Sequence, residues 1–322
     1  MSGPEKVSVI IPVKPGGEVR ALALLRDLDY PADSWEVIVA EGRFPSLQRN
    51  LASASASGNI IYFLDDDSQV GNDFLRRATA CYADPDVAAV GGPSLTPDTD
   101  TTLQHSFGMA FVSPLGGGGM RNRYRKSGRV RSTGDQELIL CNLSFRRDIF
   151  QEFGGFDERL YPNEENELME RMVKCGKKLI HDPELAILRS HRPTLTAFCR
   201  QLFSYGRGRG EQTILSGIIK PITFIPSLFI LYLLCLPFLQ NPVYYLPLLC
   251  YLFIVISVSL YHMAISGRIK SALLLPVIFP FFHVCYGIGL LRGLVRPRHK
   301  TWSGNDSAVS LKKVKEFGGD WQ

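Results

Sequence analysis

Residues 59–67 read NIIYFLDDD, an apolar run that ends on three consecutive aspartates. Similar apolar runs stand at residues 7–13 (VSVIIPV), 35–40 (WEVIVA) and 87–90 (VAAV). Such continuous runs are typical of strands that are buried on both faces of a sheet. The segments between them have helical spacing: 18–28, 46–57 and 74–82. This βαβα order predicts an α/β fold, a Rossmann-like and mostly parallel sheet with helices on both sides.

The charge of the chain is unevenly distributed. Its 322 residues include 36 Lys+Arg and 31 Asp+Glu, a formal net charge of +5. Residues 212–305 contain seven basic residues and no acidic one, and residues 306–322 are neutral, which leaves 26 basic and 28 acidic residues in 1–211. A nucleic-acid-binding domain would carry an excess of Lys and Arg on a folded face. We therefore expect no nucleic acid among the partners.

Residues 221–267 contain no Asp, Glu, Lys or Arg. Within this stretch, residues 222–239 and 243–261 are each long enough to cross the ~30 Å hydrocarbon layer of a membrane. Gln240, Asn241 and Pro242 form a turn between them. A pair of buried core helices is the alternative, but both runs exceed the roughly 10–14 apolar residues typical of such helices. The stretch therefore predicts a transmembrane helical hairpin.

A third apolar segment, 271–291, is followed by a basic cluster at 292–300. Lys220, the pair Arg268 and Lys270, and this cluster all favour the cytoplasmic side, and three full crossings would separate them. The segment is expected to be re-entrant, interfacial or spanning, and its Pro and Gly residues favour a broken helix that turns back. The predicted organisation is a catalytic domain at 1–212, a membrane region at 213–300 and a polar tail at 301–322.

Asp65, Asp66 and Asp67 stand at the carboxyl end of a predicted strand, the edge where sheets of this type bind ligands. Three adjacent carboxylates repel one another unless a cation offsets their charge. Asp65 and Asp67 can point to the same side and hold a divalent ion that also takes phosphate oxygens. An acidic turn that caps the next helix is the alternative.

A second acidic group, Glu164, Glu165 and Glu167, opens a predicted helix at 164–175. Acidic residues in a first turn complement the helix macrodipole, and Asn163 can cap the helix, so capping alone would explain the group. Together with a metal-binding aspartate cluster upstream, the group becomes a candidate source of a general base.

Six motifs in order resemble those of family 2 glycosyltransferases of the GT-A fold. They are VSVIIPV, EVIVAEG, RNLASASASGNIIYFLDDDS, NLSFRRDIFQEFGGFDE, NEENELMERMVKCG and RQLFSYGRGRG. The similarity is closest to the membrane-attached group that builds bacterial exopolysaccharides, including the succinoglycan-type glucosyltransferases. The resemblance implies a GT-A catalytic domain followed by a C-terminal helical transmembrane region.

The resemblance also implies roles for individual residues. Asp65 and Asp67 match the family's DxD motif, which implies Mg²⁺ or Mn²⁺ bridging the diphosphate of a nucleotide sugar. Asp66 would lean toward the sugar or the ribose. Glu165 matches the aspartate of the family's ED motif, the implied catalytic base.

Three further positions are implied to bind the nucleotide. Glu41 stands where relatives usually have an aspartate that reads the nucleobase, and Pro12 lies at the loop beneath it. Glu in place of Asp lengthens this contact, which bears on the expected preference for uracil. Arg49 matches the basic residue of a basic-Asn pair that faces the nucleotide.

Three residues farther along the chain complete the implied site. His191 lies where many relatives place a histidine that completes the metal shell, and an isolated surface histidine is the alternative. Arg200 and Arg207 belong to RQLFSYGRGRG, where processive synthases carry QxxRW. Ser204 and Tyr205 replace the Arg-Trp pair, which argues against a processive synthase. The two arginines could hold the diphosphate of the donor or of a lipid acceptor, or adhere to anionic headgroups.

These features predict a metal-dependent inverting hexosyltransferase that moves a sugar from a nucleotide sugar, expected to be a UDP-sugar, to a polyprenyl-diphosphate-linked saccharide in exopolysaccharide synthesis. We expect a multi-pass protein in contact with the lipid of the bacterial inner (plasma) membrane, with its catalytic domain in the cytoplasm. A polyprenyl-phosphate monosaccharide synthase is one alternative. A non-catalytic subunit of a polysaccharide assembly complex is another.

Overall fold

The computed structural model describes residues 4–298 and 308–321, which divide into two compact units. The sheet unit comprises 4–95, 122–189 and 308–321, and the helical unit comprises 96–121 and 190–298. Residues 96–121 and 190–212, which we expected in the catalytic domain, thus belong to the helical unit by their contacts. The predicted functional boundaries at 212 and 300 stay a prediction. Lys300 of the basic cluster and residues 301–307 of the tail lie outside the described residues.

The sheet unit is built on eight strands in the order β10-β2-β1-β3-β7-β4-β8-β6. A separate two-stranded sheet pairs β5 with β9. The strands are β1 (Val7–Val13), β2 (Trp35–Glu41), β3 (Ile60–Leu64), β4 (Val87–Gly91), β5 (Ser94–Leu95), β6 (Arg131–Thr133), β7 (Asn142–Arg146), β8 (Lys178–His181), β9 (Ile187–Leu188) and β10 (Ser310–Lys315). The α/β class is therefore as predicted.

The eight-stranded sheet is mixed, whereas we expected a mostly parallel one. β1 runs parallel to β2 and β3, and β4 runs parallel to β8. β7 lies antiparallel between β3 and β4, and β6 and β10 are antiparallel edge strands. The segments that precede these three strands have no βαβ periodicity, so the sequence pattern did not indicate the direction of the strands.

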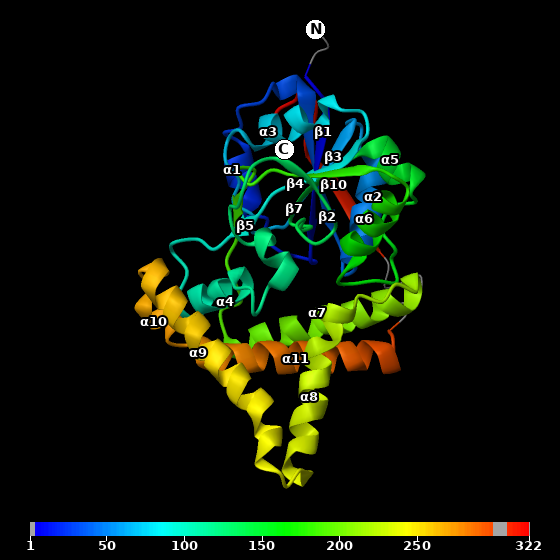
Figure 1. The fold of residues 1–322 in the computed structure, drawn as a ribbon. Coiled ribbons are helices and arrows are strands. Elements are labelled where there is room, and N and C mark those ends of the chain that lie inside the picture. The colour runs from blue at the N-terminus through cyan, green and yellow to red at the C-terminus, as the bar shows by residue number, and fades with distance from the viewer. Residues whose placement is uncertain (1–3, 299–307, 322) are drawn as a thin grey trace. The chain divides into compact units, whose positions relative to one another are not determined.

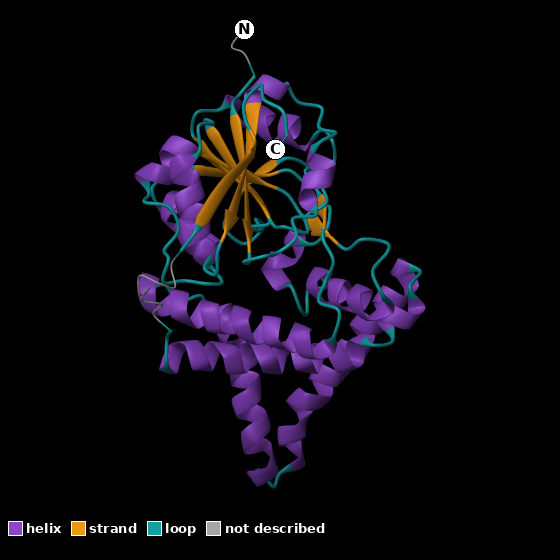
Figure 2. Ribbon diagram, turned by 180° about the vertical axis from the view of Figure 1, so that it is seen from behind, coloured by secondary structure: helices purple, strands orange, loops and turns teal. Residues whose placement is uncertain are grey.

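Both faces of the sheet are covered by helices (Figures 1 and 2). In β3, Tyr62 faces one apolar core and Phe63 the other, because successive side chains of a strand point to opposite faces. One core is covered by α1 and α3, and the other by α2, α5 and α6. The α-helices of this unit are α1 (Ala21–Leu25), α2 (Pro45–Ser55), α3 (Phe74–Ala80), α5 (Arg147–Glu152) and α6 (Glu164–Lys174), with short 3-10 turns η1 (Ala32–Ser34) and η2 (Cys81–Ala83).

The predicted polar tail supplies an edge strand. β10 pairs antiparallel with β2, and Lys313 Nζ donates to the buried carboxylate of Glu36 at 2.8 Å. Lys315 is almost fully buried, and its Nζ donates to the carbonyl oxygens of Ala32 at 2.8 Å and Trp35 at 3.0 Å. The same ammonium lies 4.4 Å from the centre of the Trp35 ring. These contacts fasten the tail to the sheet.

The helical unit is made of helices and loops (Figure 2). Its α-helices are α4 (Thr102–Val112), α7 (Leu195–Ser216), α8 (Ile225–Cys235), α9 (Leu246–Ser266), α10 (Ile269–Ala272) and α11 (Leu275–Val295). Its 3-10 turns are η4 (Pro221–Phe224), η5 (Leu236–Phe238) and η6 (Pro242–Tyr245), while η3 (Gly118–Arg123) lies at the boundary of the two units. Within the described part of the chain, three helical stretches are long and apolar enough to cross a membrane: Pro221–Phe238, Pro242–Ser266 and Leu275–Val295.

Glycines bring α7 and α11 into close contact along their lengths. A Cβ placed on Gly206 of α7 would lie 2.0 Å from the carbonyl oxygen of Tyr286, and one on Gly289 of α11 would lie 2.1 Å from that of Phe203. Only the absence of a side chain permits this approach of the two backbones. Gly287 likewise contacts the backbone of α8. The glycines that we expected to break the third apolar segment therefore serve helix packing, and α11 is continuous through Pro280.

Replacing Lys315 with Ala should destabilise the sheet unit. The change leaves the carbonyl groups of Ala32 and Trp35 without their donor, and a buried unsatisfied group costs about 1–3 kcal/mol. The midpoint of denaturant-induced unfolding should fall accordingly. Lys312→Ala, at an exposed position of the same strand, is the control and should change stability by less than about 0.5 kcal/mol. Equal effects of the two changes would contradict the role given to Lys315.

Candidate active site

The three aspartates form a tight turn at the carboxyl end of β3. Ser68 is buried beneath them, and its Oγ accepts a hydrogen bond from the backbone N–H of Asp65 at 3.1 Å while its own N–H donates to the Asp65 carbonyl oxygen. The side chains of Asp65 and Asp67 are 20% and 26% exposed, so they remain open to a ligand. Burial and the carboxylates of Asp67 and Asp65 raise the pKa of Asp66 above its ordinary value, although Arg189 lowers it.

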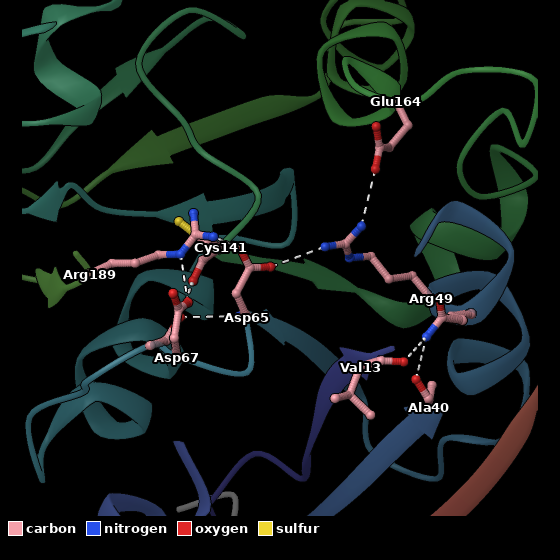
Figure 3. A network of polar contacts seen from close by, with 10 residues as sticks. Val13, Ala40, Arg49, Asp65, Asp67, Cys141, Glu164 and Arg189 are labelled. Carbon is pink, nitrogen blue, oxygen red and sulfur yellow. Dashed lines mark hydrogen bonds and ion pairs between the residues drawn. The ribbon is translucent and has the colours of Figure 1, made fainter. Parts of the chain in front are cut away.

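Arg189 bridges the first and third aspartates (Figure 3). Its Nη2 lies 3.0 Å from Oδ2 of Asp65, and its Nε donates to Oδ1 of Asp67 at 2.7 Å. The backbone explains this placement, because Leu188 and Gln69 exchange two hydrogen bonds that join the end of β9 to the turn after β3. Burial lowers the pKa of Arg189, but Asp65 and Asp67 are among the groups that raise it, and the net direction is upward. The guanidinium is therefore charged.

Arg49 connects the aspartates to the acidic group of α6. Its Nη2 lies 3.2 Å from Oδ1 of Asp65 and its Nη1 lies 3.1 Å from Oε1 of Glu164. Arg49 is 5% exposed and Glu164 is 1% exposed, so this ion pair is withdrawn from water. Figure 3 shows Arg49 between the two carboxylates. The two acidic clusters of the sequence thus lie at one edge of the sheet, joined by a single guanidinium.

The three glutamates of α6 have different partners. Glu164 is paired with Arg49, and Glu167 is paired with Arg171 one turn further along the helix. Glu165 is 7% exposed and accepts a hydrogen bond from Nδ2 of Asn166 at 3.0 Å. The ion pair of Glu165, at 3.7 Å, is longer than the pairs that Glu164 forms with Arg49 and Glu167 with Arg171.

Arg123 is the charged group nearest to Glu165. Its Nη1 lies 3.7 Å from Oε1 of Glu165, and its Nη2 donates to Oδ1 of Asn166. Its remaining donors are directed at the carbonyl oxygens of Asp135 and Gln136, at 2.6 and 2.8 Å. Arg123 is 6% exposed and thus fixed by its surroundings. It orients both Glu165 and the neighbouring amide.

Pro12 and Glu41 lie on adjacent strands at the same edge of the sheet. Pro12 is paired with Ala40 in the register of β1 and β2, and Glu41 accepts a hydrogen bond from the backbone N–H of Gly16 at 3.1 Å. Gln48 of α2 holds the two strand ends together, because its Nε2 donates to the carbonyl oxygens of Val13 and Ala40. Figure 3 shows this second junction beside the aspartates.

The remaining predicted site residues lie in the helical unit. Nε2 of His191 is hydrogen-bonded with Oγ1 of Thr96 at 2.9 Å, and its ring stacks on Phe111. Arg200 is exposed on α7. Nε of Arg207 lies 3.5 Å from Oε1 of Glu211 on the same helix. Roles for these three residues in metal or phosphate binding stay predictions.

The aspartate pair fits a divalent cation. Asp65 and Asp67 already converge on one positive group, and carboxylate oxygens are the ligands that Mg²⁺ prefers. Across residues 4–298 and 308–321, no cluster of three or more His, Cys, Asp and Glu side chains is arranged to hold a metal. Since Mg²⁺ is commonly held by one or two carboxylates together with substrate phosphates, two protein ligands suffice.

Three residues of this site escaped the sequence analysis: Arg123, Gln48 and Arg189. Arg189 stands directly after a short apolar run, LAIL at 185–188, as the aspartates stand directly after theirs. Its position at the end of a strand was the feature of the sequence that could have identified Arg189 as a site residue. Arg123 lies in the basic, glycine-rich stretch 116–131, and nothing in its pattern separates it from its neighbours.

A family model described as "Glycosyl transferase family group 2" matches residues 60–284. The match includes the aspartate turn, α6, the apolar helices α8 and α9, and the first half of α11.

Two curated relatives match about half of the chain at low identity. The chain is 26% identical over 170 residues to the succinoglycan biosynthesis protein ExoA of Rhizobium meliloti, an alignment that covers 52% of this chain and 48% of that protein. It is 26% identical over 163 residues to the O-antigen chain rhamnosyltransferase RfbN of Salmonella typhimurium, covering 49% and 50% respectively. The chain thus spans about half the length of the curated relatives it matches.

Among solved structures, the chain is similar to the mannosyltransferase PcManGT from Pyrobaculum calidifontis in complex with GDP-Man and Mn²⁺. The TM-score is 0.57 at 16% identity, and the superposition covers 91% of this chain and 88% of that one. At this level of identity the comparison establishes a shared fold.

Arg49→Met should destabilise the sheet unit strongly. It leaves the carboxylate of Glu164 buried without its cation, and breaking a buried ion pair costs about 3–5 kcal/mol. The double variant Arg49→Met, Glu164→Gln removes the unpaired charge and should recover part of this loss. Denaturant-induced unfolding of the full chain in detergent measures both.

Arg159→Met is the matched control for this experiment. Arg159 pairs with Asp157 at 2.7 Å but is 56% exposed, and exposed pairs contribute about 0–1 kcal/mol. If Arg49→Met were no more destabilising than Arg159→Met, the link between the two acidic clusters would not be the structural element described here.

Proposed function

The chain belongs to glycosyl transferase family group 2, and from this premise we propose that it is a metal-dependent inverting glycosyltransferase that moves a sugar from a nucleotide sugar to a lipid-linked saccharide in the membrane. The observation that carries the proposal is the meeting of Asp65, Asp67 and the first turn of α6 at one edge of the sheet, through Arg49. A metal-binding pair and a carboxylate base at one edge are what an inverting transfer needs.

Glu165 is the proposed general base. A base must be able to receive a proton in the transition state, and a carboxylate locked in an ion pair is poorly suited to do so. Glu164 is locked by Arg49 at 3.1 Å, whereas the nearest cation to Glu165 is at 3.7 Å. Glu165 would take the proton of the acceptor hydroxyl, whose oxygen forms a bond to the anomeric carbon as the bond to the diphosphate oxygen breaks. Arg123 and Asn166 would hold the carboxylate in position.

Asp65 and Asp67 would hold a divalent cation, Mg²⁺ or Mn²⁺, with Asp66 directed toward the sugar or the ribose. When bound, such an ion offsets the charge that develops on the departing nucleoside diphosphate. The Pyrobaculum mannosyltransferase that shares this fold contains Mn²⁺ and GDP-Man. That finding supports a nucleotide sugar of some kind as the donor here.

The donor is proposed to be a UDP-sugar that binds along the ends of β1 and β2. Glu41 and Pro12 would meet the nucleobase, since Gly16 and Gln48 fix the backbone around them. Arg49 would remain with Asp65 and place a positive charge beside the diphosphate. Arg200 and Arg207 of α7 are proposed to bind phosphate groups of the donor or the lipid, with His191 as a further metal ligand.

The helical unit is proposed to attach the protein to the bacterial inner (plasma) membrane, with the sheet unit in the cytoplasm. Within this unit α8 and α9 converge on a turn, while α11 lies along α7 and crosswise to them (Figure 1). If the α8–α9 hairpin crosses the membrane, α11 would lie at its surface with the charged helix α7. Lys220, Lys270 and Arg292 would then share one side, as the positive-inside rule requires.

The proposed acceptor is a saccharide on a polyprenyl diphosphate, because a membrane-attached enzyme meets that substrate at the headgroup layer. ExoA and RfbN, named for succinoglycan synthesis and O-antigen rhamnosyl transfer, support a place in polysaccharide assembly. A bare polyprenyl phosphate is the second candidate, and parallel assays with both acceptors separate them. Nucleotide-sugar binding without turnover on either would indicate a non-catalytic subunit.

Transfer should depend on the cation and on two carboxylates. We expect EDTA to abolish the release of nucleoside diphosphate by the purified chain with donor and acceptor, and Mn²⁺ or Mg²⁺ to restore it. Asp67→Ala should prevent cation-dependent turnover. Glu165→Gln should lower kcat by about 10²–10⁴-fold, the usual contribution of a general base.

Glu167→Gln is the matched control, since Glu167 lies on the same helix and pairs with Arg171. This variant should retain nearly full activity. Full activity of Glu165→Gln together with loss in Glu164→Gln would move the base to Glu164 and refute the assignment.

A further inference from the structure

Arg189 contacts both carboxylates that the proposed function assigns to the metal. Its Nη2 is 3.0 Å from Asp65 and its Nε is 2.7 Å from Asp67 (Figure 3). Two nitrogens of one guanidinium thus engage two separate side chains, a use of its fork that a lysine could not reproduce. The positive charge lies among the oxygens that would coordinate the cation.

We propose that Arg189 is an internal counter-ion that holds Asp65 and Asp67 in the donor-free protein and competes with the divalent cation for their oxygens. The inference rests on the proposed function, because it takes these two aspartates as the metal ligands. Three adjacent carboxylates at a strand end repel one another, and Arg189 offsets that repulsion while no cation is present. A cation and a guanidinium at the same oxygens would repel each other, so binding of the cation requires release of Arg189.

Arg189 is better placed for this exchange than Arg49. Arg49 is 5% exposed and fastened at its other end to Glu164, which is 1% exposed. Arg189 is 24% exposed, and it forms ion pairs with the two aspartates that the cation would bind. It also follows the two-residue strand β9 rather than lying within a long helix. Arg49 therefore stays with Asp65, and Arg189 is the group that moves.

A released guanidinium needs a new anionic partner. The diphosphate of the donor is such a group, since guanidinium pairs with phosphate through short, charge-assisted hydrogen bonds. Arg189 would thus weaken cation binding in the absence of donor and lose that effect when donor is present. Cation and nucleotide would therefore bind cooperatively. In the absence of donor, the aspartates would bind divalent cations only weakly.

The test is a titration of the full purified chain in detergent with Mn²⁺ alone, followed by electron paramagnetic resonance of free Mn²⁺. Arg189→Gln should bind Mn²⁺ about tenfold more tightly than the natural chain, a difference of about 1.4 kcal/mol. Without metal its unfolding temperature should be lower, and saturating Mn²⁺ should raise that temperature by more than in the natural chain. Adding UDP or GDP should narrow the difference in Mn²⁺ affinity.

Arg131→Gln is the matched control. Arg131 is 28% exposed and pairs with Glu137 at 2.8 Å in the same unit, so its loss removes a comparable ion pair away from the aspartates. Its Mn²⁺ affinity should equal that of the natural chain. If Arg189→Gln does not fold, Arg189→Lys replaces it. The single nitrogen of a lysine does not reproduce the two-nitrogen fork that engages one carboxylate with each nitrogen, so this variant should also bind Mn²⁺ more tightly.

The outcomes separate this inference from the proposed function. Suppose that the natural chain binds Mn²⁺ and that Asp67→Ala abolishes this binding. If the Arg189 variants then bind Mn²⁺ no more tightly than the natural chain, the inference is overturned and the proposed metal site stands. Absence of Mn²⁺ binding in every variant overturns both. If the Arg189 variants bind Mn²⁺ more tightly and adding Asp67→Ala abolishes that binding, the inference and the proposed metal site are both supported.

Discussion

An alternation of charges across one edge of the sheet is the interaction on which the rest of the site depends. Arg189, the aspartates, Arg49 and Glu164 follow one another as positive, negative, positive and negative groups at separations of 2.7–3.2 Å. Four different segments of the chain supply them: the end of β9, the turn after β3, α2 and the start of α6. Burial of Arg49 and Glu164 strengthens this pairing and makes its loss costly, so the fold and the proposed chemistry share one network.

In the helical unit, the packing of the helices depends on close contact between the backbones of α7 and α11. Gly206 of α7 and Gly289 of α11 let a charged helix and an apolar helix lie against each other. α11 is nearly half buried, whereas the two stretches of the predicted hairpin are mostly exposed. This difference distinguishes a helix that packs against protein along its length from helices whose apolar surfaces need lipid. If α11 lies at the membrane surface as proposed, the basic groups around all three apolar segments can remain on one side of the membrane.

The sequence was informative where short-range patterns decide structure. The continuous apolar runs located β1, β2, β3 and β4, and the acidic clusters indicated the edge at which Asp65 and α6 meet. It was uninformative where distant segments meet. β10 pairs with β2 across most of the chain because Lys313 neutralises the buried Glu36, and Arg189 reaches Asp67 because of one bridge between Leu188 and Gln69. Such pairings depend on topology, which hydrophobic periodicity does not encode.

The central claim is that Asp65 and Asp67 exchange a guanidinium for a divalent cation when donor binds. Anomalous diffraction from crystals of the full chain grown with Mn²⁺ and a nucleoside diphosphate tests it most directly. The account predicts a manganese peak at the carboxylates of Asp65 and Asp67, with Arg189 withdrawn from both and Arg49 still paired with Glu164. A nucleotide bound at this edge with no manganese at the aspartates, and with Arg189 still bridging them, would contradict it.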